Sequence, residues 1–89
     1  MTLADIAARC RSLAFATLDT AAELDARSRD GDVHYQGAQK LANEALDRAE
    51  IVYALATLLD RLARVPMANS YPPYVDAAQR LADLAGVDL

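Results

Sequence analysis

The sequence predicts a small all-α protein, with a long antiparallel helical hairpin, a shorter third helix packed across it, and association into an oligomeric helical bundle. Apolar residues recur at intervals of three and four over two long stretches, as in amphipathic helices. Turn-forming and helix-breaking residues interrupt this pattern around residues 28–32 and 65–72. The predicted helices span about residues 3–28, 33–64 and 73–85.

The length of the chain limits how it can be stabilised. With 89 residues it is shorter than most domains, so residues 1–89 form one predicted domain. A chain of this size buries only about 60–65% of its unfolded surface. Cys10 is the only cysteine and His34 the only histidine, so neither an intrachain disulfide nor a structural zinc site is expected. Oligomerisation and close helix packing remain as sources of stability.

Charge and hydropathy narrow the class of protein. Nine basic residues stand against thirteen acidic ones, giving a net charge of −4 without any basic run, so no nucleic-acid partner is expected. No stretch reaches about 18 uncharged apolar residues, and residues 1–5 lack the pattern of a secretory signal, so no membrane association is expected. The predicted location is the cytoplasm. The bias toward alanine, and toward arginine over lysine, suggests a GC-rich bacterial genome.

The first predicted helix has two apolar sides. Thr2 is a good N-cap, and Asp5 places a carboxylate in the first turn, where it favours the positive end of the helix dipole. We call the main apolar stripe of each long helix its predicted seam. For the first helix the seam comprises Leu3, Ile6, Cys10, Leu13, Thr17, Thr20 and Leu24. Phe15 and Leu18 belong to the other apolar side, and one neighbouring helix cannot cover both.

The second predicted helix follows a turn at Asp30-Gly31-Asp32, in which Gly31 supplies a positive φ and Asp32 can cap the helix. Its predicted seam comprises Ala38, Leu41, Ala45, Arg48, Val52, Leu55, Leu59 and Leu62, with Arg48 as the one charged member. Residues 51–65 are apolar on nearly all sides, which is typical of a buried helix.

Prolines and a glycine delimit the third predicted helix. Pro66 ends the second helix, and Pro72 and Pro73 open the third, where their missing N–H groups cost nothing. Gly86 is predicted to cap the end of the helix, with Val87 folding back onto the last turn.

Several residue types that often carry chemistry have ordinary structural explanations here. His34 lacks a second ligand at helical spacing and is expected to be a surface or capping residue. Glu44, Asp47 and Glu50 lie opposite the predicted seam and indicate a solvated helix face rather than a magnesium site. Cys10 lies in the seam without a nearby base, so an inert buried thiol is expected. We therefore predict no catalytic residue, metal or cofactor.

The position of Arg48 is consistent with two interpretations. A charged residue on an apolar seam either forms a structural ion pair, here with Glu23 or Asp25, or binds an anionic ligand. The second reading supports an alternative function, a small dimeric helical enzyme or anionic-ligand-binding protein with its site near Arg48.

The leading expectation is a non-enzymatic helical interaction module: a homo-oligomeric adaptor, regulator or inhibitor that binds another protein through apolar helix faces. The hairpin carries more large apolar side chains than one short helix can cover, and such clusters mark association sites. Two tyrosines beside two prolines add a rigid amphipathic surface of the kind enriched at interfaces. The predicted interface residues are Phe15, Leu18, Ile51, Leu58, Tyr71 and Tyr74.

Overall fold

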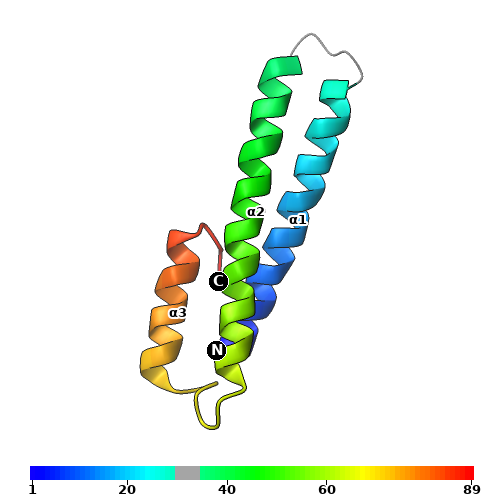
Figure 1. Ribbon diagram of the computed structural model, residues 1–89. Helices are drawn as coiled ribbons and strands as arrows, with labels where there is room; N and C mark the ends of the chain where they lie inside the picture. Colours follow the sequence, from blue (N-terminus) through cyan, green and yellow to red (C-terminus); the bar gives the residue numbers. More distant parts are fainter. Residues whose placement is uncertain (30–34) are drawn as a thin grey trace.

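The computed structural model describes residues 1–29 and 35–89, which form three helices and no strand. Helices α1 (Leu3–Arg29) and α2 (Tyr35–Ala63) run antiparallel side by side, and α3 (Pro72–Leu84) packs against one end of this hairpin (Figure 1). The predicted all-α hairpin with a shorter third helix is confirmed. The predicted turn at residues 30–32, the start of the second helix at residue 33 and the role of His34 lie outside the described residues.

The start of α1 is tied down by two sets of hydrogen bonds. The Asp5 N–H donates to Thr2 Oγ1 at 3.2 Å, and the Thr2 N–H donates to the Asp5 carboxylate at 2.9 Å, a reciprocal capping box. Asn69, in the linker before α3, accepts the next two free donors: the Leu3 N–H at its carbonyl and the Ala4 N–H at its side-chain oxygen. The predicted Thr2 cap is confirmed, and Asn69 connects the start of α1 to the linker between α2 and α3.

The end of α3 is a Schellman motif built on Gly86. Gly86 has a φ of +79°, its N–H donates to the Asp83 carbonyl, and the Val87 N–H donates to the Ala82 carbonyl. Val87 is buried against the core cluster. The predicted glycine cap with Val87 folded back is confirmed. Tyr71 is the N-cap of the same helix, with prolines at its first two positions as predicted.

The hairpin interior differs in part from the predicted seams. On both helices small residues repeat every seven positions and are buried, which lets the two helices lie close together. These residues are Ala7, Ala14, Ala21 and Ser28 on α1, and Ala42, Ala49 and Ala56 on α2. Leu41 is 53% exposed and Thr20 is also exposed, so their assignment to the seam was wrong. Arg48 is exposed too, and Ala49 occupies the interior position instead.

Six other predicted seam residues are buried as expected, namely Leu3, Ile6, Cys10, Ala38, Val52 and Leu59. The predicted seam residues near α3 line the groove into which it packs. Leu13, Leu55 and Leu62 are partly buried against a core shared by all three helices. The members of this core are Leu3, Ile6, Ala7, Cys10, Ala14, Val52, Ala56, Leu59, Val75, Ala78, Ala82 and Val87. The core therefore occupies one end of the molecule, where α3 is present.

Beyond α3, the hairpin continues as two helices alone. The molecule measures 53 × 19 × 14 Å, and its radius of gyration is 15.8 Å against about 12 Å for a compact domain of this length. Because α3 is less than half as long as α1 or α2, no other described helix covers the hairpin outside the core.

Candidate protein-interaction surfaces

The side of the hairpin away from α3 carries an exposed apolar patch, which we call the back face: Phe15, Leu18, Leu46 and Tyr53. Phe15 and Tyr53 lie two residues from Leu13 and Leu55, which is about 200° around each helix from the α3 groove. All four back-face side chains are between 42% and 51% exposed. The Phe15 and Tyr53 rings meet edge to face with centroids 6.0 Å apart. They border an open hollow of about 300 Å³ that also includes Ala49 and Glu50.

A second hollow continues the back face toward the far end of the hairpin. It has a volume of about 280 Å³, and small side chains such as Ala21, Ala22 and Ala42 form much of its lining. Leu18 and Leu46 line both hollows and stand between them. The back face thus has a raised aromatic pair on one side of Leu18 and a shallow alanine-lined depression on the other.

Polar groups close both ends of the back face. At the end nearer α3, the guanidinium of Arg11 pairs with the carboxylate of Asp60, and both side chains are about one-third exposed. At the far end, Asp25 pairs with Arg29 at 3.2 Å.

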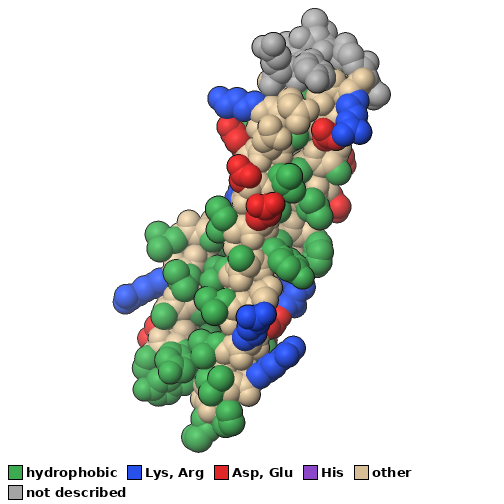
Figure 2. Space-filling view, viewed as in Figure 1, with side chains coloured by type: hydrophobic (Ala, Val, Ile, Leu, Met, Phe, Trp, Pro, Cys, Tyr) green, Lys and Arg blue, Asp and Glu red, His purple; other side chains and the backbone are tan. Residues whose placement is uncertain are grey.

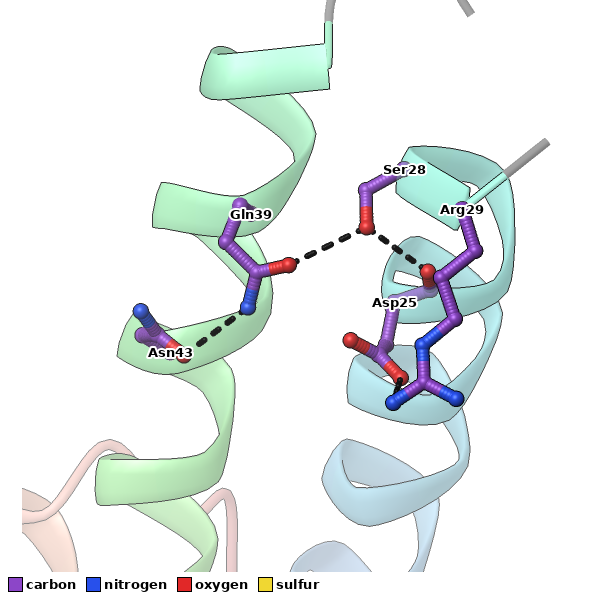
Figure 3. Close-up of polar contacts among 5 residues, drawn as sticks. All are labelled: Asp25, Ser28, Arg29, Gln39 and Asn43. Carbon is purple, nitrogen blue, oxygen red and sulfur yellow. Dashed lines mark hydrogen bonds and ion pairs between the residues drawn. The ribbon is translucent and has the colours of Figure 1, made fainter. Parts of the chain in front are cut away.

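The far end also contains a buried hydroxyl whose hydrogen bonds are satisfied. Ser28 is 1% exposed, and its Oγ donates to the Asp25 carbonyl at 2.7 Å and lies 3.1 Å from Gln39 Oε1 (Figure 3). The Gln39 amide nitrogen in turn donates to Asn43. These hydrogen bonds link α1 to α2 at the end of the hairpin that lies away from the apolar core.

A different apolar surface runs along α2 and α3, and we call it the α2–α3 face. It is formed by Ile51 and Leu58 on α2, by Val65 just after the end of α2, and by Leu81 and Leu84 on α3, each between 45% and 84% exposed. Figure 2 shows hydrophobic side chains gathered over the three-helix half of the molecule, with acidic side chains mostly on the upper part of the hairpin. Glu44 and Asp47 lie beside Ile51 and Leu84 at the edge of this face.

The two tyrosines predicted as interface residues lie at the base of the molecule. Tyr71 and Tyr74 meet edge to face with centroids 4.8 Å apart, and both are exposed. With Val65, Pro66 and Met67 they line an open hollow of about 360 Å³.

The six predicted interface residues therefore fall into three places. Phe15 and Leu18 belong to the back face, Ile51 and Leu58 to the α2–α3 face, and the tyrosines to the base. A short third helix could cover one of the first two pairs but hardly both, and α3 covers neither, because it packs in the leucine-lined groove between them. Sequence reasoning missed Leu46 and Tyr53, which complete the back face. Leu46 and Tyr53 are seven residues apart, and so are Leu41, Arg48 and Leu55 in the predicted seam. Spacing alone therefore could not show which of these two sides of α2 faces the back of the hairpin.

Arg48 lines the edge of an open groove that prolongs the α3 groove along the hairpin. The groove has a volume of about 520 Å³, with Leu13, Thr17 and Leu41 among its lining residues. Arg48 Nη2 donates to the Gly86 carbonyl at 3.2 Å. The ion pairs among residues 1–29 and 35–89 join Arg11 to Asp60 and Arg29 to Asp25, so the predicted ion pair of Arg48 with Glu23 or Asp25 is wrong. Glu44 lies in the same groove and disfavours an anion there. Ligand binding at Arg48 stays a prediction.

The remaining candidate residues are placed as follows. Cys10 is fully buried, and this burial raises the pKa of its thiol, which disfavours the reactive thiolate. Glu44, Asp47 and Glu50 are exposed on α2. Within residues 1–29 and 35–89, no three histidine, cysteine or acidic side chains lie close enough together to hold a metal ion.

Comparisons with protein-family models, with curated proteins and with solved structures find no match to this chain. None of the three helices in the described part of the chain combines the length and apolar character needed to cross a bilayer.

Proposed function

We propose that this protein is a non-enzymatic interaction module, an adaptor that pairs with a second copy of itself through the back face and presents its α2–α3 face to another protein. The observation that carries the proposal is the amount of surface left open by the elongated hairpin. The accessible surface is 6060 Å². A folded monomer of this mass is expected to expose about 5,100 Å².

The excess of about 1,000 Å² is comparable with the roughly 800 Å² that each partner contributes to a standard protein interface. The exposed side chains are also of the right kind. Aromatic residues surrounded by smaller apolar ones, with charges confined to the edge, are the usual composition of an interface centre. The back face resembles this arrangement, with Phe15 and Tyr53 among its apolar residues and ion pairs at both ends, and Glu50 is the one charged residue that lines the hollow beside the two rings.

Charge favours the back face for self-association. A symmetric pair brings the same surface of two copies together, so a surface with one sign of charge repels itself. The ends of the back face carry Arg11 and Arg29 together with Asp60 and Asp25. At the edge of the α2–α3 face, the carboxylates of Glu44 and Asp47 stand beside one guanidinium, that of Arg48, so this edge has a net negative charge. Such an edge favours a partner with an apolar helix face and basic residues beside it.

Light scattering coupled to size exclusion tests the self-association. The protein at micromolar concentration should elute with about twice its chain mass of 9.6 kDa. Phe15→Glu should return the monomer mass while keeping the helical circular-dichroism signal, because it places a charge at the centre of the apolar patch.

Leu58→Glu is the matched control. Leu58 is 57% exposed against 51% for Phe15, but it lies on the α2–α3 face, so this variant should remain a dimer. A monomeric parent protein would contradict the proposal. A dimer that Leu58→Glu dissociates and Phe15→Glu leaves intact would assign self-association to the α2–α3 face instead.

A further inference from the structure

The back-face side of α1 has an internal symmetry that is independent of the amount of apolar surface. Residues 11, 15, 18, 22 and 25 follow one another at intervals of four, three, four and three, so they form one stripe along the helix. Leu18 is at its centre. Arg11 lies seven residues before it and Asp25 seven residues after it, about 10.5 Å away in each direction.

We propose that two copies pair antiparallel as a four-helix bundle, about a two-fold axis that passes at the level of Leu18 with α1 facing α1. The inference rests on the proposed self-association and specifies its geometry. In this arrangement Leu18 meets Leu18 of the second copy. Arg11 meets Asp25 of the second copy, and the symmetry makes this ion pair twice.

Shape supports the same arrangement. Phe15 stands on one side of Leu18 and is 51% exposed, whereas the alanine-lined depression around Ala22 lies on the other side. The two-fold axis brings Phe15 of each copy over Ala22 of the other. A large side chain then enters a hollow of about 280 Å³ at two equivalent places, which is the packing that helix pairs need at their usual separation of about 8–10 Å.

The positions of the back-face residues on α2 are consistent with the same axis. Leu18 shares a hollow with Ala49 and Glu50, so these residues lie near its level. Leu46 and Tyr53 are placed evenly on either side of that level, and so are Gln39 and Asp60. Leu46 therefore meets Tyr53 of the second copy. The carboxylates of the two Glu50 residues approach each other, and they are the one unfavourable pair in this geometry.

A parallel pairing is the alternative symmetric arrangement, and it would place α1 against α2 of the second copy. Arg11 would then face Asp60, and Phe15 would face Tyr53. Within one chain, Arg11 already pairs with Asp60, and the Phe15 ring already contacts the Tyr53 ring, so the parallel pairing would repeat these contacts. The antiparallel pairing instead gives Arg11 and Asp25 a new opposite charge and fills the hollow at Ala22.

Cross-linking with a short bismaleimide tests the axis, because the native Cys10 is buried and serves as the unreactive background. Leu18→Cys should cross-link to itself. Arg11→Cys and Asp25→Cys should each cross-link poorly alone, since two-fold mates lie about 21 Å apart, but efficiently when the two variants are mixed. Glu23→Cys, on the outward side of α1, is the control and should give only background product.

The outcomes separate the geometry from the self-association. Cross-linking of Leu18→Cys together with preferential cross-linking of the mixed variants supports the antiparallel axis. A dimer by light scattering in which Arg11→Cys links to itself as readily as to Asp25→Cys overturns the axis but leaves self-association standing. A monomer by light scattering overturns both.

Discussion

Single residues explain how this short chain holds its ends in place. Gly86 takes a φ of +79°, and a Cβ at this position would lie 2.7 Å from Arg48 Nη2. The backbone conformation therefore favours glycine there, and a side chain at this position would in addition displace the flexible end of Arg48. Arg48, which the sequence suggested as a seam residue or an anion site, makes its hydrogen bond to the carbonyl of this cap. A cation at the end of α3 also faces the negative end of the helix dipole.

The capping box at the start of α1 predicts a specific pH dependence. The hydrogen bond from the Thr2 N–H, followed by that from the Thr2 hydroxyl, lowers the pKa of the Asp5 carboxyl. Because the folded pKa lies below the unfolded one, the cap contributes stability above about pH 4 and loses it as the pH falls through the folded value. The unfolding free energy of the parent should therefore exceed that of Asp5→Asn at neutral pH, and the difference should shrink in acid.

Urea denaturation at fixed protein concentration between pH 7 and pH 2.5 measures this difference. Asp19→Asn is the control, since it removes an exposed carboxylate from the middle of α1, away from the helix start. A difference between parent and Asp5→Asn that stays constant through acid would contradict the capping role.

At the scale of helices, alanine rather than leucine decides how α1 and α2 meet. The positions that repeat every seven residues inside the hairpin are Ala7, Ala14 and Ala21 on α1, facing Ala42, Ala49 and Ala56 on α2. Small side chains let the backbones approach, and the larger leucines are left along the edges of the pair. One edge receives α3, and the other becomes the back face.

Enlarging one of these alanines tests the close packing. Ala49→Leu should destabilise the protein by about 1–3 kcal/mol, because a larger side chain does not fit between the helices. Ala54→Leu adds the same atoms at an exposed position of α2 and should change stability by less than about 0.5 kcal/mol. Urea denaturation at equal protein concentration compares them. Equal effects of the two substitutions would show that Ala49 does not face α1.

For the whole molecule, the uneven distribution of the core predicts uneven local stability. All three helices contribute to the core near the start of α1 and the end of α2, whereas only two helices meet toward the far end of the hairpin. Regions with fewer buried apolar contacts open more easily. Amide protons at residues 3–14 and 52–63 should therefore exchange more slowly than those at residues 17–29 and 38–48.

Hydrogen–deuterium exchange on Phe15→Glu measures this gradient without protection from a second copy. Under the proposed self-association, the parent protein should show added protection along the far part of the hairpin. Uniform exchange along the hairpin of the variant would contradict the idea that α3 supplies the extra stability.

The candidate surfaces were predictable only in part. The sequence indicated that Phe15 and Leu18, and likewise Ile51 and Leu58, cannot all be covered by a short third helix, and all four are exposed. Leu46 and Tyr53 were missed because the predicted seam of α2 ran through Leu41 and Arg48. The seam was predicted through the larger side chains, whereas the interior of the hairpin contains the smaller residues next to them, Ala42 and Ala49.

The sequence by itself determined where the helices are and several of their ends. Helical spacing, the Thr2 and Asp5 pair, the prolines at residues 72 and 73 and the glycine at residue 86 act locally, so their effects do not depend on distant parts of the chain. Only the tertiary structure decided which side of each long helix faces the other. Spacing by threes and fours describes two adjacent stripes equally well, one through Leu13 and one through Ala14. The two helices pack through the stripe of small residues that includes Ala14, because small side chains let the helices approach closely. Helix α3 packs in the groove lined by the larger residues of the other stripe, which includes Leu13.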